Sequence, residues 1–171
     1  MTADGFTALY DRHARALLRY CARRVGPDTA EDVVAQTFLV AYEQRHRYDP
    51  DRADALPWLY GIATRLLARH RRDEVRWYRA LARTGADPLI GGRTVVESHE
   101  PRADERTDAQ RRAQQIAGVL ADLPARQRDV LLLYAIGELS YGEIATVLDI
   151  PVGSVQSALH RARTKLRHAL T

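Results

Sequence analysis

Apolar residues recur at helical spacing through most of the chain. Over residues 6–25 they fall at intervals of three and four, which is typical of one buried helical face. The members of this face are Phe6, Leu9, Tyr10, His13, Leu17, Tyr20 and Cys21. Gly26 and Pro27 then interrupt the pattern, so the first helix is predicted to end near Val25.

Two more helices are predicted before residue 73. Asp28 and Glu31 have the spacing of an N-cap and its acidic partner, so the second helix is predicted to run from Asp28 to about Arg47. Its buried stripe comprises Val33, Thr37, Phe38, Ala41 and Tyr42. A third helix is predicted to begin near Pro57, which suits a first helical turn. Its inward residues are Trp58, Ile62 and Leu66.

Periodicity weakens between residues 73 and 111, where Gly, Pro and charged residues cluster. This segment is predicted to be a linker, although its first residues keep some helical character. Beyond it, one apolar stripe predicts a helix that ends at Pro124, and a further helix is predicted from Ala125 to Ile136 with Gly137 as its C′ residue. The predicted fold class is all-α: a three-helix domain over residues 1–72, the linker, and a second helical domain over residues 112–171.

Residues 140–170 have the pattern of two short helices joined by a tight turn. Ser140 and Glu143 form a capping box, which fixes the start of the first of these helices. Asp149 occupies the turn and tolerates a positive φ better than most residues. Pro151 then sits where a helix can begin. These features predict a helix-turn-helix.

The outward face of the last helix is polar and cationic. Val155, Leu159, Ala162 and Leu166 are expected to face inward, which leaves Ser154, Gln156, Ser157, His160, Arg161, Arg163 and Thr164 outward. Residues 154–171 carry four formal positive charges and no acid. Such a helix can contact DNA phosphates and bases. Cations near a helix C-terminus also stabilise the helix dipole, and this simpler explanation stays open here.

Composition adds a basic balance to this picture. The 171 residues are 46% hydrophobic and 28% charged, which is typical of a folded globular protein. The formal net charge is +4, and Lys165 is the only lysine, so the positive charge comes almost entirely from arginine. This balance suits a polyanionic partner, although arginine-rich usage also has compositional origins.

Several classes of function are not expected. The single Cys21 allows neither an intrachain disulfide nor a cysteine-based zinc site. The six histidines are scattered and no Gly-rich phosphate loop precedes a helix, so we expect no catalysis, no metal and no cofactor. No signal-peptide pattern and no run of about 18 apolar residues occurs, which predicts a cytoplasmic protein without membrane insertion.

Two blocks of the chain resemble a known family. TAEDVVAQTFLVAY followed by ALPWLYGIATRLLARHRR, and then DLPARQRDVLLLYAIGELSYGEIATVLDIPVGSVQSALHRARTKL, are similar to the extracytoplasmic-function branch of bacterial RNA polymerase sigma factors. The resemblance implies a two-domain helical protein that binds core RNA polymerase, recognises minus 10 and minus 35 promoter elements and helps to open the duplex. It also implies regulation by an anti-sigma factor.

The resemblance assigns residues to two of these roles in the first domain. Core polymerase binding falls on Asp28, Glu31, Asp32 and Gln36, and the family commonly has Gln-Glu where this chain has Ala35-Gln36. Minus 10 binding falls on the loop 46–56 and the exposed face of the third helix. The candidates that could stack on bases or hold phosphates there are Tyr48, Tyr60, Arg65, Arg69 and Arg72, while Trp58 is expected in the core. Asparagine is common in the family at the place of Arg65.

Minus 35 binding is assigned to the last helix. The residues concerned are Ser154, Gln156, Ser157, His160, Arg161, Arg163 and Lys165. Family members often have arginine at the places of Gln156 and Ala158, so we expect an altered or weakened minus 35 preference. The alternative function is a ligand- or signal-responsive helix-turn-helix regulator that binds DNA without polymerase, because the second domain alone would permit it.

Overall fold

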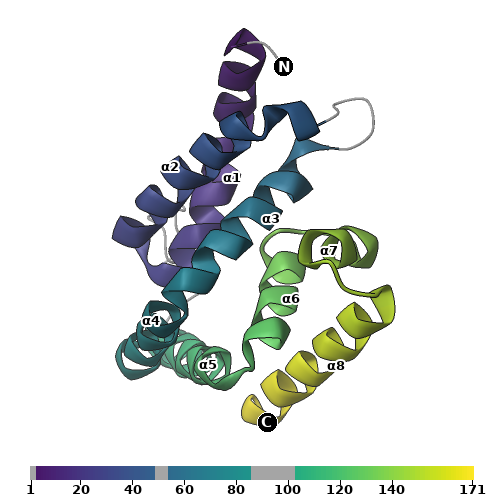
Figure 1. Ribbon diagram of the computed structural model, residues 1–171. Helices are drawn as coiled ribbons and strands as arrows, with labels where there is room; N and C mark the ends of the chain where they lie inside the picture. The colour runs from purple at the N-terminus through teal and green to yellow at the C-terminus, as the bar shows by residue number, and fades with distance from the viewer. Residues whose placement is uncertain (1–2, 49–53, 86–102) are drawn as a thin grey trace.

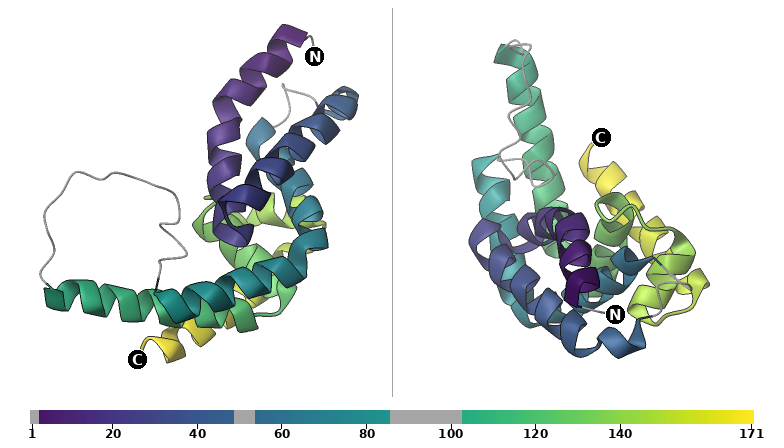
Figure 2. Two further views of the ribbon diagram at one scale, coloured as in Figure 1. Left: turned by 90° about the vertical axis from the view of Figure 1, so that its left-hand side faces the viewer. Right: turned by 90° about the horizontal axis from the view of Figure 1, so that it is seen from above.

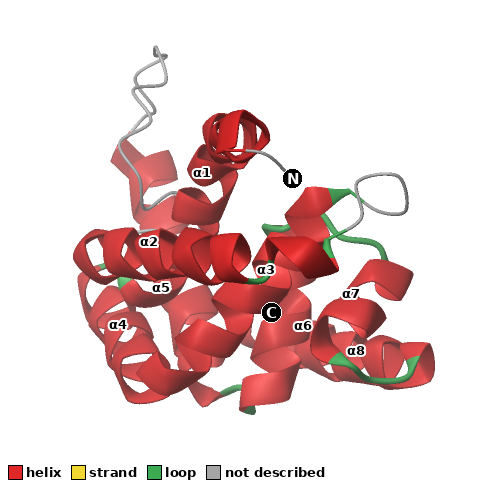
Figure 3. Cartoon of the chain, turned by 45° about the horizontal axis from the view of Figure 1, so that its top comes forward, coloured by secondary structure: helices red, strands yellow, loops and turns green. Residues whose placement is uncertain are grey.

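The computed structural model describes residues 3–48, 54–85 and 103–171, and these are folded into helices joined by short turns (Figures 1 and 3). No strand occurs in these three ranges, so the predicted all-α class is confirmed. The α-helices are α1 Ala3–Val25, α2 Pro27–Glu43, α3 Ala55–Leu67, α4 Arg71–Thr84, α5 Ala103–Asp122, α6 Ala125–Ala135, α7 Tyr141–Leu148 and α8 Val152–Ala169. Short 3-10 turns lie at Arg45–Arg47 and Ala68–His70.

Helices α1 to α3 pack along one another as predicted, with small differences at their surfaces. Leu17, Tyr20 and Cys21 of α1 are fully buried. Tyr10 and Tyr42, which were expected to face inward, are 47% and 41% exposed. They lie at the open end of the bundle, where Phe6 and Phe38 take the inner positions and the tyrosine rings pack against their edges.

The start of α2 differs from the prediction. Its N-cap is Gly26, not Asp28, and Pro27 occupies the first turn. Gly26 has a φ of +84°, a conformation that favours glycine, and a side chain there would come within 3.2 Å of the Trp77 ring. The tight passage between α1 and α2 therefore depends on this glycine, and Asp28 is left inside the first turn with its carboxylate exposed.

The predicted linker is helical at both of its ends. Residues 73–84 belong to α4 and residues 103–111 belong to α5, while the rest of that segment, apart from Gly85 at the end of α4, lies outside the described residues. The two helices pack against each other (Figure 2), and Gln110 of α5 donates a hydrogen bond to the Thr84 carbonyl at 3.2 Å. Helix α4 buries Tyr78 and Leu81, a spacing of three that the many charged residues around it obscured in the sequence.

The helix-turn-helix forms as the sequence predicts. The hydroxyl of Ser140 accepts from the Glu143 amide, and the Glu143 carboxylate accepts from the Ser140 amide at 2.8 Å, which completes the capping box. Asp149 adopts a left-handed conformation with φ of 53°. Gly137 follows the C-cap of α6, but the positive φ falls on Glu138 instead. Glycine is required at 137 because a Cβ would lie 2.6 Å from the Leu133 carbonyl oxygen.

A buried cluster of charged side chains joins the two halves of the chain. The Arg24 guanidinium of α1 is fully buried and contacts Glu74 of α4 and Asp129 of α6, each at 2.6 Å. Arg71 donates to the other Asp129 oxygen at 2.7 Å, and Arg128 Nε lies 3.2 Å from Glu74. Burial opposes ionisation of Asp129, yet the two arginines hold its pKa below the ordinary value.

The packing of the halves extends beyond this charge cluster. Helix α7 of the helix-turn-helix packs on α3 of the first bundle, and buried apolar side chains from both halves form one continuous core. We refer to this packing, with α7 on α3 and Asp129 on Arg24, as the closed arrangement. It places the helix-turn-helix directly beside the third helix, although about 80 residues separate them in the sequence.

Replacing Arg24 with methionine should destabilise the protein strongly. The substitution preserves bulk but leaves Glu74 and Asp129 buried without their shared cation, which typically costs about 3–5 kcal/mol. Urea unfolding followed by far-ultraviolet circular dichroism measures the difference. Arg19→Met, at an exposed position of the same helix, is the matched control and should change the unfolding free energy by no more than about 0.5 kcal/mol. A loss below about 1 kcal/mol for Arg24→Met would show that the cluster is not a stabilising contact.

Candidate protein and nucleic-acid interfaces

The outward face of α8 is formed as the sequence predicts. Val155, Leu159 and Ala162 are buried against the neighbouring helices, which fixes the rotation of α8 about its axis. The residues assigned to minus 35 binding are therefore brought together on the opposite face. Gln156, Ser157, His160, Arg161, Arg163 and Lys165 are all exposed, and Ser154 is half-buried.

Ala158 does not belong to this face. It is only 5% exposed. It lies with Ser157 and Arg161 on the wall of a cleft of about 320 Å³ between the start of α6 and the start of α8. Of the two departures from the family pattern in α8, Gln156 lies on the exposed face and Ala158 lies at the wall of this cleft.

The arginine side chains of α8 differ in their contacts with the rest of the protein. The Arg163 guanidinium lies over the Tyr134 ring at 4.7 Å, and its interaction with the tyrosine hydroxyl raises the pKa of Arg163. Arg161 donates to the Ser157 carbonyl of its own helix, at 3.3 Å. On the other wall of the cleft, the exposed Arg126 of α6 faces the same region. Arg126 was not among the residues assigned from the sequence, although it is a basic residue at the start of the helix that precedes the helix-turn-helix.

The residues assigned to minus 10 binding are only partly brought together. Arg65, Arg69 and Arg72 are exposed, and Tyr48 is half-buried. Tyr60 was wrongly assigned, because it is 1% exposed and its ring packs against Tyr20 at 4.9 Å. Burial raises the pKa of Tyr60 to about 12. Residues 49–53 of the assigned loop lie outside the described residues.

Trp58, and not Tyr60, is the aromatic side chain of α3 that lies at the surface. It is half-buried and its ring stacks on Tyr48, with ring centres 5.1 Å apart and planes 13° from parallel. Trp58 and Arg65 line one side of a groove of about 500 Å³, and Thr146 and Val147 of α7 line the other. The spacing of Trp58, Gly61 and Arg65 marks one helical face and could have revealed this arrangement from the sequence.

The outer face of α2 is acidic with an apolar end. Asp28, Glu31, Asp32 and Gln36 are all exposed, and Leu39 continues the same face with 59% of its surface exposed. Helix α2 begins with its amides unpaired, so carboxylates in the first turn are favoured there whether or not a partner binds. The exposed Leu39 has no such intramolecular explanation, and sequence analysis did not single it out. Large apolar side chains beside charges are typical of the centre and rim of a protein interface.

Other kinds of site are not evident in the described parts of the chain. Within residues 3–48, 54–85 and 103–171, His, Cys, Asp and Glu side chains form no group of three arranged to hold a metal ion. Cys21 is buried, and burial raises the pKa of its thiol to about 12, which opposes formation of a thiolate. None of the described helices has the length and apolar character needed to cross a bilayer.

Each half of the chain matches a known protein family. Residues 9–82 match the family described as Sigma-70 region 2, and residues 113–166 match Sigma-70, region 4. The first match ends at residue 82, within α4, so it includes most of the helix at the start of the predicted linker. A regulator with only a helix-turn-helix would not require the first match, and nothing favours that alternative.

The chain is similar to sigma factors over most of their length. The chain is 31% identical over 170 residues to the ECF RNA polymerase sigma factor SigW of Bacillus subtilis, covering 98% of this chain and 89% of that protein. It is 36% identical over 167 residues to the sigma factor CnrH of Cupriavidus metallidurans, covering 94% and 84%.

Solved structures show the same fold. The structure of CnrH with the cytosolic domain of CnrY superposes with a TM-score of 0.65 at 29% identity, covering 99% of this chain and 89% of that one. The sigma factor RpoE of Bartonella quintana, solved with the anti-sigma factor NepR, superposes with a TM-score of 0.66 at 20% identity, covering 98% of each chain. The chain therefore belongs to the extracytoplasmic-function branch of the sigma-70 family, whose members direct RNA polymerase to promoters.

Proposed function

We propose that this sigma factor divides its contacts among three helices: α2 binds core RNA polymerase, α3 binds the minus 10 element and α8 binds the minus 35 element. The observation that carries the proposal is the separation of charge over these helices. The outer face of α2 is acidic, whereas the exposed face of α8 is cationic and the exposed Arg65, Arg69 and Arg72 follow one another from the end of α3 to the start of α4. A nucleic acid is attracted to the second kind of surface and repelled by the first.

The face of α2 suits a basic protein partner. Asp28, Glu31 and Asp32 supply negative charge that would steer a positively charged surface, and Leu39 supplies apolar area that is lost from water on binding. Gln36 lies between these parts and can hydrogen-bond to either charged or neutral groups. We infer that the docking is driven by charge at its rim and by Leu39 at its centre.

The groove beside α3 suits unpaired bases. Trp58, whose ring stacks on Tyr48, gives the groove an aromatic wall, and Arg65 lines the same groove. Bases of single-stranded DNA stack on such surfaces for about 1–3 kcal/mol each, and a nearby cation holds the backbone. Helix α7 covers one side of the groove in the closed arrangement, so α7 would have to move before a strand could lie along α3.

The face of α8 suits intact duplex. Gln156 and Ser157 lie near the start of the helix, the end that usually enters the major groove in a helix-turn-helix. Gln156 can read adenine through two hydrogen bonds, whereas arginine at that place would read guanine. His160, Arg161 and Lys165 lie further along and are placed to contact phosphates. Arg163, held against Tyr134, serves the helix-turn-helix itself as well as the DNA.

The closed arrangement cannot serve both promoter elements at once. The two elements are centred about 25 base pairs apart, which is roughly 85 Å of duplex at 3.4 Å per base pair. A compact chain of this length has a radius of gyration of about 16 Å. We therefore infer that α7 and α6 leave the first bundle when the promoter is bound, and that contacts such as Arg24 to Asp129 are exchanged for contacts with polymerase and DNA.

An anti-sigma factor is a further proposed partner. The related RpoE and CnrH structures contain NepR, an anti-sigma factor, and the cytosolic domain of CnrY. Such a partner would find two complementary surfaces here, the acidic and apolar face of α2 and the cationic face of α8. A protein that covers either face would block one of the contacts that transcription requires.

Transcription with purified core polymerase tests the proposed function directly. Core polymerase alone should give no specific transcript from a library of promoter sequences, and core polymerase with this protein should enrich promoters that share two separated motifs. Enrichment of a single motif near minus 35, bound equally well without polymerase, would instead support a regulator that acts without joining the enzyme.

Asp32→Arg should weaken binding to core polymerase by about tenfold or more. The change places a cation in the middle of the acidic face, where it repels a basic partner, and a charge juxtaposition of this kind typically costs more than 1.4 kcal/mol. Fluorescence anisotropy with labelled protein and titrated core polymerase measures the affinity. Asp11→Arg makes the same charge change at an exposed position of α1 and should leave the affinity within twofold. Equal effects of the two variants would remove α2 from the interface.

Gln156→Ala and Lys165→Ala should weaken promoter binding in different ways. Loss of a base contact relaxes the preference at one or two positions, with a cost of about 1–3 kcal/mol for the preferred base. Loss of a phosphate contact weakens binding to all sequences equally and reduces the salt dependence. Selection from a library randomised at minus 35, carried out with holoenzyme, separates the two effects. An unchanged selected motif with Gln156→Ala would show that Gln156 does not read a base.

A further inference from the structure

A regular row of arginines follows one face of α3 and α4. Its members are Arg65, Arg69, Arg72, Arg76, Arg79 and Arg83. Successive members are four, three, four, three and four positions apart. The five intervals span 18 positions, an average of 3.6 per interval, which equals the number of residues per turn of an α-helix. All six side chains are exposed. We call this row the arginine stripe; its first three members are among the proposed minus 10 contacts, and the last three have no assigned role.

The second half of the arginine stripe lines an open groove. Arg72, Arg76, Arg79 and Arg83 lie along a groove of about 550 Å³ whose floor includes Arg71 and Arg128. The two floor arginines pair with Asp129 and Glu74, carboxylates that Arg24 also contacts. Among the residues that the structure describes, Arg76 has one exposed acidic neighbour, Asp73 at 3.2 Å, and Arg72, Arg79 and Arg83 have no acidic partner.

The chemistry of this groove favours a phosphate backbone over a protein. Among the described residues, Val75 is the only apolar one that lines it, so a protein partner would find no apolar centre there of the kind that stable interfaces contain. Evenly spaced guanidinium groups instead match a polymer with evenly spaced negative charges. From Arg72 to Arg83 the helix rises about 16 Å, which corresponds to about five base pairs of duplex, and the whole stripe covers about eight.

We propose that the arginine stripe on α4 holds the duplex immediately upstream of the minus 10 element through its phosphates, without regard to base sequence. The inference rests on the proposed role of α3 in binding the minus 10 element. Helix α4 continues from α3 through a single turn at Ala68–His70, and the chain then leads to the half that binds minus 35. The DNA that lies beyond the minus 10 contacts in this direction is the double-stranded spacer between the two elements.

Replacing Arg76, Arg79 and Arg83 together by alanine tests the proposal. The slope of log affinity against log salt is negative, and each lost phosphate contact reduces its magnitude by about 0.9. The triple variant should therefore have a slope that is smaller in magnitude by about 2.7. Its affinity deficit should consequently be roughly 40-fold larger at 50 mM than at 200 mM salt. Reconstituted holoenzyme, bound to promoter duplexes by anisotropy at four or more salt concentrations, gives both slopes.

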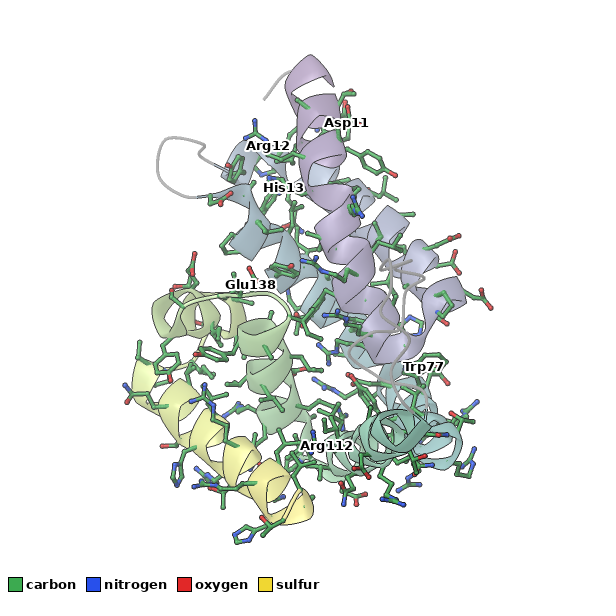
Figure 4. The ribbon with its side chains drawn as sticks, turned by 180° about the vertical axis from the view of Figure 1, so that it is seen from behind. Asp11, Arg12, His13, Trp77, Arg112 and Glu138 are labelled. Atoms are coloured by element: carbon green, nitrogen blue, oxygen red, sulfur yellow. The ribbon has the colours of Figure 1, made fainter. Side chains whose placement is uncertain are left out.

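The matched control replaces three other arginines. Arg12, Arg15 and Arg19 are exposed on α1 with the same spacing of three and four, and Arg12 lies far from Trp77 of α4 (Figure 4). Their replacement by alanine removes equal charge and should leave the slope within about 0.5 of the original. In a second arm, the promoter ends at the upstream edge of the minus 10 element. The stripe variant and the original protein should then bind this shortened duplex alike.

Three results would overturn the proposal while leaving the sigma function intact. One is an unchanged slope for the stripe variant on a promoter that the original holoenzyme binds. Another is an equal loss with the shortened duplex, because the stripe would then act at the minus 10 element itself. The third is weakened assembly of the variant with core polymerase and an unchanged slope, which would make the stripe a protein contact. Failure of the original holoenzyme to bind any promoter would instead refute the proposed function.

Discussion

The arrangement of the whole molecule depends on one buried guanidinium group. Arg24 lies at the end of α1, is inaccessible to water and is balanced by Glu74 and Asp129 from two other helices. An isolated charge in such a place would be too costly to keep, so α4 and α6 must lie where their carboxylates meet it. This requirement ties the first bundle to the helix that precedes the helix-turn-helix. The contact of α7 with α3 then follows, because α6 and α7 are joined by a short turn whose geometry Gly137 and Glu138 restrict.

The closed arrangement also explains how the surfaces are distributed. The acidic face of α2, the cationic face of α8 and the arginine stripe are exposed, whereas the aromatic groove of α3 is shared with α7. The faces that bind by charge are therefore open to a partner, and the face that would receive unstacked bases is partly occupied. A first encounter of this molecule with polymerase or duplex need not wait for the halves to separate, whereas contact with single-stranded DNA does.

Much of this fold was predictable because local rules determined it. The capping box at Ser140, the turn at Asp149 and the apolar stripes of α1 and α8 are short-range patterns that the structure confirms. The wrong predictions concern residues whose burial is determined by contacts with residues distant in the sequence. Tyr60 resembles a stacking residue in sequence, but Tyr20 buries it. The helix α4 carries so many charges that its buried face was not recognised, and the closest partners of two of those charges, Arg71 and Glu74, come from α1 and α6. No pattern within α4 reports on those partners.

The polar character of the contact between the halves has a consequence for reversibility. An interface made of leucines alone would expose a large apolar surface whenever the halves separated, and such a surface promotes aggregation. Arg24, Arg71, Glu74, Arg128 and Asp129 would instead recover their hydration as soon as water reached them. This charged part of the interface therefore adds no apolar surface when the halves separate, and the apolar surface exposed on opening is confined to the core that continues from one half to the other.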